Sequence, residues 1–287
     1  MKTNIYNKVT NLILEKLRQG VIPWRKSWVS YYPHNFISKK EYQGINFILL
    51  SSYDFPSHYF LTFKQAKKLG GNVLKGAHGL PVVFWKILNY TDAKIKEDSI
   101  EMKDKHFPFM KNSTVFNLSQ TSLYREEKAK LKELPPRPKA KDLLQSLSFV
   151  PEIRNNKGKA YYTPAQNFIS IPFKNQFESM DEYYATLFHE IIHSTGHKEK
   201  LNRFTQPDQF NHKSHAYSFE ELIAEIGSSF LCAMCGIDNT LDNSASYIKG
   251  WLSKLQDDEK LIIKASTQAK NAVNFLLNKS NEVKKVA

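Results

Sequence analysis

The sequence predicts an α+β protein, with a basic α+β region in its N-terminal half and a mainly helical region with a small sheet in its C-terminal half. Apolar residues recur at helical spacing in several separate segments, and short β-branched runs bounded by Gly and Pro indicate strands. The length of 287 residues allows two modest domains with hydrophobic cores. The formal net charge is +13, and the whole excess lies in residues 1–140. We therefore expect one domain at 1–130, a linker at 131–145 and a second domain at 146–287.

The composition is that of a globular protein, with 41% hydrophobic and 24% charged residues. No apolar stretch reaches the roughly 20 residues that cross a bilayer, and the N-terminus lacks the apolar core and cleavage site of a signal peptide. Only two cysteines occur, Cys232 and Cys235, which argues against a disulfide framework and fits a reducing compartment. We expect a cytoplasmic protein with no membrane partner.

Several elements are expected in the N-terminal half. Apolar residues spaced by three and four predict a helix over residues 3–19, which Gly20 ends. The other expected elements are a loop over 21–46, a short buried helix over 44–53, a helix over 62–69 capped by Thr62, a strand over 82–90, its partner strand over 113–121, and a polar hairpin excursion over 91–112.

Basic and aromatic residues are interleaved in this half, which contains three of the four tryptophans. Such interleaving suits a protein that follows a phosphate backbone and stacks on unpaired bases, although a basic surface over an aromatic core has the same composition. In the loop we expect the tryptophans to be partly buried and the charged residues and tyrosines to lie nearer to solvent. The candidate contacts to single-stranded DNA are Trp24, Arg25, Lys26, Trp28, Tyr31, Tyr32, Lys39, Lys40, Tyr42 and Lys64.

The C-terminal half begins after a stretch rich in charge and proline, residues 125–142, which indicates a linker. The elements expected after it are strands over 160–162 and 168–171 that form a hairpin, and helices over 181–195, 218–235, 244–256 and 258–278.

The first of these helices contains His189-Glu190-Ile191-Ile192-His193, the H-E-x-x-H pattern of zinc hydrolases. Residues four apart share a helix face, so both imidazoles can bind one ion while Glu190 reaches a metal-bound water. A merely solvated face is the weaker alternative, because the rest of the helix is apolar. We expect zinc, or alternatively manganese, and a metal-assisted hydrolysis of an amide in an unknown protein or peptide.

A catalytic zinc site of this kind needs a third protein ligand and an open position for water. The longer metzincin pattern fails, because Glu199 stands where it requires histidine. A glutamate on a later helix, as in thermolysin-like enzymes, completes the site, and we predict Glu221. We predict that Glu225, one turn further, accepts a hydrogen bond from a ligand histidine. Two alternatives remain open: Glu221 could cap the helix in a Ser218-x-x-Glu221 box, or Glu220 or Glu225 could be the ligand.

Some neighbouring residues are candidates without a settled role. His197 and Tyr217 could line the site, and one of His212, His215 and Tyr217 could stabilise an oxyanion. The two cysteines lie on an apolar helix and are more typical of core thiols than of a second zinc site.

Taken together, these motifs resemble those of the ArdC-type antirestriction proteins of mobile elements. The matching N-terminal residues are Gly20-Val21-Ile22-Pro23-Trp24, Trp28, Pro33-His34-Asn35, Tyr42-Gln43-Gly44-Ile45-Asn46, Leu61-Thr62-Phe63-Lys64-Gln65-Ala66 and Val115-Phe116-Asn117. The matching C-terminal residues are Tyr161-Tyr162, Ile171-Pro172, His189 to His197, Leu201-Asn202-Arg203, Phe219 to Glu225 and Phe230-Leu231-Cys232. The resemblance covers nearly the whole chain.

By this resemblance, the first domain binds single-stranded DNA without strong sequence preference, and the second is a zincin-like metallopeptidase domain with a divalent metal in a gluzincin-like site. The implied role is protection of incoming plasmid or transposon DNA from host restriction. Similar N-terminal domains also occur joined to plasmid primases. One departure is Asn167, where the family pattern has an acidic residue.

Two other hypotheses fit the residues. The chain could be a cytoplasmic zinc metallopeptidase that cleaves a host protein and uses its basic half for docking. Alternatively, the metal could only hold the C-terminal fold together.

Overall fold

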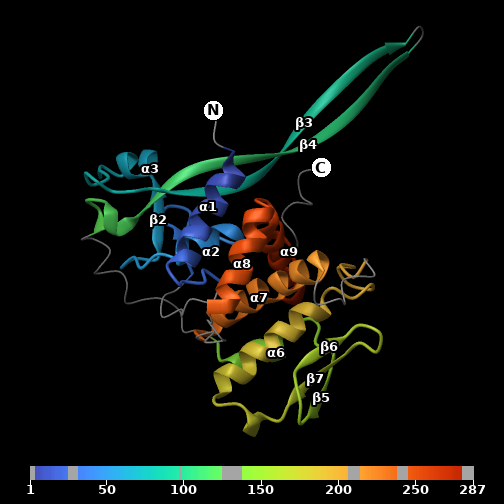
Figure 1. The fold of residues 1–287 in the computed structure, drawn as a ribbon. Helices are drawn as coiled ribbons and strands as arrows, with labels where there is room; N and C mark the ends of the chain where they lie inside the picture. Colours follow the sequence, from blue (N-terminus) through green and yellow to red (C-terminus); the bar gives the residue numbers. More distant parts are fainter. Residues whose placement is uncertain are drawn as a thin grey trace.

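The computed structural model describes residues 4–24, 32–96, 99–124, 138–205, 214–237 and 245–279, with the backbone alone described for 85–96, 99–110 and 245–246. The mixed α and β class predicted from the sequence is confirmed (Figure 1). The helices and strands, in chain order, are α1 (Ile5–Arg18), β1 (His34–Asn35), α2 (Ile45–Ser51), β2 (Tyr59–Thr62), α3 (Phe63–Lys68), β3 (Leu80–Lys96), β4 (Ser99–Asn117), α5 (Ala140–Ser146), β5 (Glu152–Asn156), β6 (Tyr161–Thr163), β7 (Phe168–Pro172), α6 (Met180–Ser194), α7 (His215–Cys235), α8 (Ala245–Asp257) and α9 (Leu261–Leu276).

The three helices predicted in the N-terminal half are present as α1, α2 and α3, with ends within two residues of the prediction. After α1, Gly20 has a φ of 78°, a left-handed conformation that glycine adopts without strain and that ends the helix as expected. Thr62 caps α3, because its hydroxyl accepts a hydrogen bond from the Gln65 amide and the Gln65 side chain accepts one from the Thr62 amide.

The N-terminal sheet has the strand order β1-β2-β4-β3. Strands β1 and β2 are parallel, and the other pairs are antiparallel. Of the long strand β4, only the inner end pairs with β2, from Phe60 opposite Asn117 to Thr62 opposite Val115. The remainder of β3 and β4 therefore leaves the sheet as a two-stranded ribbon.

This ribbon extends far beyond the body of the protein (Figure 1). Its pairing runs from Leu80 opposite Val115 to Lys96 opposite Ser99. Residues 91–96 and 99–112 of the predicted hairpin excursion do form a hairpin, but as a continuation of the two strands, so the strand ends predicted at Tyr90 and Ser113 are wrong. The polar and charged residues of 91–112 led us to end the strands before them, but a ribbon that leaves the sheet can keep its backbone paired without burying an apolar face.

The C-terminal sheet has the order β5-β7-β6, and β6 and β7 form the predicted antiparallel hairpin. Strand β5, parallel to β7, was not predicted, because its sequence EIRNN contains a single apolar residue. Asn167 lies in the turn before β7 with a φ of 51°, and its side-chain oxygen accepts a hydrogen bond from the Tyr162 hydroxyl at 2.9 Å. Asparagine tolerates this left-handed conformation better than most residues, which gives the departure at this position a structural reason.

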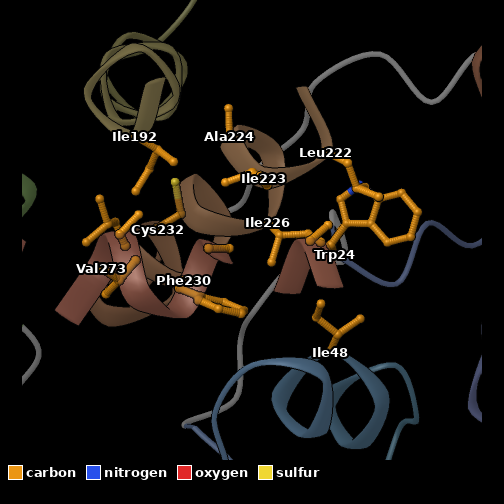
Figure 2. Packing of buried hydrophobic residues seen from close by; sticks show 14 of the residues in the cluster. Trp24, Ile48, Ile192, Leu222, Ile223, Ala224, Ile226, Phe230, Cys232 and Val273 are labelled. Atoms are coloured by element: carbon orange, nitrogen blue, oxygen red, sulfur yellow. The ribbon is translucent and has the colours of Figure 1, made fainter. Parts of the chain in front are cut away.

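Helix α7 is the centre of the C-terminal half and is buried along most of its length, with α6 and α9 packed against it (Figure 2). Helices α6 and α7 approach each other closely at Gly227. A Cβ atom added to Gly227 would lie 2.9 Å from the side chain of Ile192. This close approach brings the H-E-x-x-H helix and the glutamate-rich start of α7 together.

The N-terminal and C-terminal halves share one hydrophobic core. Residues of α1 and α2 belong to the same buried cluster as residues of α6, α7 and α9. Trp24 is fully buried in this cluster together with Ile48 and Leu222 (Figure 2). Part of the expected linker is also structured, because residues 140–146 form α5 and Leu143 is buried. Among the described helices, none combines the length and the apolar character that a bilayer crossing requires.

Candidate metal centre

Helix α6 presents the two histidines of the H-E-x-x-H pattern on one face. The Ser179 hydroxyl caps its start by accepting a hydrogen bond from the Glu182 amide, and the buried apolar residues Leu187 and Ile191 hold the helix against the core. The Nε2 atoms of His189 and His193 lie 3.1 Å apart. Two imidazole nitrogens are thus already close enough to share one ion.

Glu221 on α7 completes the group. Its Oε2 atom lies 3.4 Å from His189 Nε2, and its Oε1 atom lies 3.5 Å from His193 Nε2. Zinc bonds of 2.0–2.2 Å place the ligand atoms of a tetrahedral site about 3.3 to 3.5 Å apart, so this triangle fits a small divalent ion. Within the described ranges, these three residues are the group whose donor atoms all lie within 4.8 Å of one another.

The start of α7 decides between the alternatives for Glu221. The helix begins at His215, with Ser214 as its cap and the Ser214 hydroxyl accepting a hydrogen bond from the Tyr217 amide. Ser218 therefore lies inside the helix, so the capping box that we considered for Glu221 is not formed. The Glu221 carboxylate is left to face the two histidines.

Glu190 is buried, with 7% of its surface exposed, although it belongs to a charged residue type that is seldom buried. Its charge helps to raise the pKa of both His193 and Tyr217, which places the carboxylate near the metal ligands. A buried carboxylate next to a metal site has the position and the chemistry of a general base.

The carboxylate that contacts a ligand histidine is Glu220, and the prediction that Glu225 has this role is wrong. Glu220 Oε1 lies 3.2 Å from His193 Nδ1. Glu225 is 6% exposed, and its Oε2 atom instead accepts a hydrogen bond from the Trp24 indole at 2.8 Å and another from the Tyr247 hydroxyl. Glu225 lies one turn further along α7 than Glu221, about 6 Å along the helix axis, where its partners are Trp24 and Tyr247.

Arg203 holds Glu220 in place. Its guanidinium donates to both carboxylate oxygens, from Nη2 to Oε1 at 2.7 Å and from Nε to Oε2 at 3.0 Å. It also donates to the Thr195 hydroxyl and to the Ile192 carbonyl, which ties it to the end of α6. Sequence reasoning gave no role to Arg203 or Glu220 in supporting His193, because only folding brings the segment after α6 against the start of α7.

Hydrogen bonding sets the charge state of the cluster. Burial disfavours a charged His193, but its hydrogen bonds to Glu220 and Glu221 outweigh burial and raise its pKa to about 10. Burial likewise opposes ionisation of Glu221, yet hydrogen bonds to His189 and His193 hold its pKa well below the usual range. The metal-free cluster thus pairs an anionic Glu221 with a protonated His193, which has to lose its proton before its Nε2 atom can bind a cation.

The other predicted site residues lie around this group. Tyr217 hydrogen-bonds to Glu221, and burial together with that carboxylate raises the pKa of its phenol. His197 is buried beyond the end of α6, and its Nδ1 atom accepts a hydrogen bond from the Glu199 amide at 3.3 Å. His215 is the exposed first residue of α7, whereas His212 lies outside the described residues.

Both halves of the chain match known protein families. Residues 138–268 match a family described as zincin-like metallopeptidase, and residues 3–116 match the N-terminal domain of anti-restriction factor ArdC. Crystal structures of the antirestriction ArdC protein from plasmid R388, metal-free and Mn(II)-bound, superimpose with TM-scores of 0.74 and 0.72 at 35% and 33% identity. These matches cover 96% and 97% of this chain and 97% and 99% of the ArdC chains. The chain belongs to the ArdC antirestriction family. The resemblance inferred from the sequence is thereby confirmed.

Further relatives differ in length: one is about as long as this chain, and two are much longer. An uncharacterized protein of Sinorhizobium fredii is 30% identical over 96% of this chain and 92% of its own length. Two DNA primases named TraC from Escherichia coli are 30% and 29% identical, but this chain spans only 27% and 20% of their lengths. The zincin-like domain and the Mn(II)-bound relative indicate that this ArdC-type site holds a divalent metal.

The structure changes the set of aromatic DNA-contact candidates in the ArdC N-terminal region. Trp24 is fully buried and Tyr42 is 6% exposed, so the structure does not support these two candidates as DNA contacts. Tyr32 is half-buried, and its hydroxyl donates to the Phe230 carbonyl at 2.6 Å. Trp24 and Tyr32 pack in the core shared by the two halves, whereas Tyr42 belongs to a separate cluster of N-terminal residues.

The basic candidates Lys39, Lys40 and Lys64 are exposed. Arg25, Lys26, Trp28 and Tyr31 lie outside the described residues. Cys232 is buried and Cys235 half-buried, neither forms a disulfide, and burial raises the pKa of the Cys232 thiol. This arrangement fits the expected core thiols.

Proposed function

We propose that this chain is an antirestriction-type protein that binds single-stranded DNA through its basic N-terminal half, carries a gluzincin-like metallopeptidase site, and protects incoming DNA from host restriction. The observation that carries the enzymatic part is the triangle of His189, His193 and Glu221, with donor atoms 3.1 to 3.5 Å apart. Membership of the ArdC family supports the antirestriction part.

The donor set suits a catalytic metal. Two histidines and a glutamate are the protein ligands of thermolysin-type zinc sites, which leave one position open for water or substrate. We propose Zn²⁺ as the metal, with Mn²⁺ as the alternative that the Mn(II)-bound relative supports. When bound, such an ion polarises a carbonyl and acidifies water.

The residues of the chain have distinct parts in the proposed reaction. Glu190 accepts the proton of the attacking water at its carboxylate and delivers it to the leaving amine. Arg203 and Glu220 orient the His193 ring through Nδ1, so that Nε2 points at the ligand position. In the reaction, the Tyr217 hydroxyl turns its single O–H from Glu221 to the oxyanion that develops on the substrate.

The nucleic-acid part of the proposal rests on charge. The excess of positive charge lies in residues 1–140, and Lys39, Lys40 and Lys64 are exposed there. Lysines that neutralise phosphates bind DNA without reading its sequence, which agrees with non-specific binding.

A plasmid-transfer assay tests the proposal as a whole. DNA that carries restriction sites is transferred into a restricting host, with the wild-type chain or with His189→Ala/His193→Ala supplied. We expect the wild type to raise survival of the DNA and the double variant to lose this effect if the metallopeptidase site is required. Equal protection by the two proteins would separate antirestriction from the metal site, and protection by neither would contradict the antirestriction role.

The alternative function is a metallopeptidase that cleaves a host protein and uses the basic half for docking. The complete metal site with its buried base favours it as much as the first proposal. Salt-dependent binding to a single-stranded oligonucleotide distinguishes them, because docking to protein alone predicts no such binding even at low salt.

A further inference from the structure

The β3–β4 ribbon has all its lysines on one face. In an antiparallel ladder, directly opposite residues share a face and successive residues alternate between faces. The register from Phe84 opposite Lys111 to Lys96 opposite Ser99 therefore divides the ribbon into two sets of positions. One set contains every lysine of 84–96 and 99–111: Lys86, Lys94, Lys96, Lys103, Lys105 and Lys111. The other set contains no lysine or arginine.

Aromatic residues share the lysine-bearing face. Phe84 pairs with Lys111, Lys86 with Phe109, and Tyr90 with Lys105. Phe107, opposite Leu88, belongs to the same face. In the half nearest the body of the protein, three of the four cross-strand pairs on this face therefore join a cation to a ring.

The two halves of the ribbon differ in net charge on this face. In the outer half, Asp92 is opposite Lys103 and Glu101 is opposite Lys94, so opposite charges offset each other across the strands. The inner half contains Lys86, Lys105 and Lys111 and no carboxylate. The positive charge of the inner half is not offset on its own face.

The inner end of this face is open to solvent. Phe84 is 46% exposed, one of the large apolar side chains that the fold leaves at the surface, and its partner Lys111 is exposed as well. Beyond this pair the two strands stay paired as far as Lys96 and Ser99, and the outer part of the ribbon stands away from the body (Figure 1). A ligand can therefore reach the face at this inner end.

We propose that this inner face, formed by Phe84, Lys86, Leu88, Tyr90, Lys105, Phe107, Phe109 and Lys111 and here called the lysine face, is the surface that binds single-stranded DNA. The inference rests on the DNA binding in the proposed function and gives it a location. Lysines neutralise phosphates, and the rings between them stack on unpaired bases, whose faces a duplex hides. This surface therefore prefers a single strand to a duplex.

The central test is Lys86→Gln/Lys105→Gln/Lys111→Gln in the full chain, with a labelled single-stranded DNA oligonucleotide of mixed sequence titrated at several salt concentrations. We expect affinity to fall about tenfold or more at low salt. The slope of log affinity against log salt should become shallower by about 2, since each phosphate contact on a single strand contributes about 0.7. Circular dichroism and thermal unfolding verify that the variant remains folded.

The matched control is Lys157→Gln/Lys159→Gln/Lys249→Gln, which removes the same charge from exposed positions in the C-terminal half. It should bind nearly as well as the wild type. If the wild type binds and both triple variants lose affinity equally, net charge explains the binding and the lysine face is rejected. If the wild type does not bind single-stranded DNA at all, the DNA-binding part of the proposed function fails first.

Two further variants test the face itself. The first adds Asn89→Lys/Thr91→Lys/Ala93→Lys to the variant that lacks Lys86, Lys105 and Lys111. It restores the positive charge of the ribbon, but on the opposite face. Affinity should stay low, and full recovery would overturn the proposal. Phe107→Leu/Phe109→Leu should weaken binding to the single strand about fivefold or more and leave duplex binding almost unchanged. Equal losses for both DNA forms would contradict base stacking.

Discussion

Glu220 Oε1 lies 3.2 Å from Nδ1 of His193, while the same carboxylate receives two hydrogen bonds from Arg203. The ring of one proposed metal ligand is therefore oriented by a carboxylate that is itself fixed by a buried guanidinium. Such outer contacts determine which imidazole nitrogen faces the metal and how strongly it binds.

The first prediction concerns this contact. Glu220→Gln should lower metal affinity about 10- to 100-fold, because the amide holds the His193 ring less firmly and removes a negative charge from the site. Zn²⁺ or Mn²⁺ titration by calorimetry measures the change. Glu225→Gln is the control, since Glu225 contacts Trp24 and Tyr247 instead, and its affinity should match the wild type. Equal losses in both variants would remove Glu220 from this role.

The second prediction concerns the buried ion pair. Arg203→Ala should lower the free energy of unfolding by about 3–5 kcal/mol, because it leaves the buried Glu220 carboxylate without its partner. The double variant Arg203→Met/Glu220→Met should lose much less free energy of unfolding than Arg203→Met and Glu220→Met lose together. Urea unfolding of the metal-free proteins gives these values. Simple additivity would mean that the pair contributes no coupling energy.

The third prediction separates the base from the ligands. Glu190→Gln should keep the metal and lose any peptidase activity, because an amide cannot accept the proton of water. His189→Ala should lose the metal, since it removes one of the three donors. Metal content by mass spectrometry and cleavage of a general peptide substrate such as casein are the measurements. Cleavage retained by Glu190→Gln would exclude Glu190 from the mechanism.

The fourth prediction tests the close approach of α6 and α7. Replacing a glycine inside a helix by alanine normally stabilises the helix by about 1 kcal/mol. At Gly227, however, the new methyl group would lie 2.9 Å from Ile192, and such overpacking costs about 1–3 kcal/mol. We expect a net loss of stability in the wild type. In an Ile192→Ala background the same change should become stabilising, as seen by urea unfolding. An unchanged sign would show that the two helices are not in tight contact there.

The fifth prediction concerns the bond between the two halves. Trp24→Phe removes an indole donor from the buried Glu225 carboxylate and should cost about 1–3 kcal/mol beyond the loss of ring volume. Trp251→Phe is the control, because this neighbouring ring packs edge-on against Trp24 at 5.8 Å. Thermal unfolding of both variants, followed by far-UV circular dichroism, gives the comparison. An equal effect of the two substitutions would assign the Trp24 contribution to packing alone.

Local rules were sufficient for most of the secondary structure. Helical spacing and caps located α1, α3, α6 and α7 to within three residues, because these signals depend on neighbours along the chain. The same rules missed β5 and ended the two ribbon strands too early. These segments are strands because they pair with a neighbouring strand, and their polar residues show no local pattern that predicts this pairing.

The sequence by itself determined the residue types of the metal centre, since H-E-x-x-H on a helix places two histidines on one face whatever the rest of the chain does. It also determined that the positive charge belongs to the N-terminal half. Tertiary structure decided which of three nearby glutamates does what: Glu221 faces the histidines, Glu220 supports His193, and Glu225 accepts the Trp24 indole. Tertiary structure also decided that Trp24, a candidate DNA contact, lies in the core shared by the two halves. The physical reason is that a helix presents side chains in all directions, and only the neighbours packed around it assign each direction a partner.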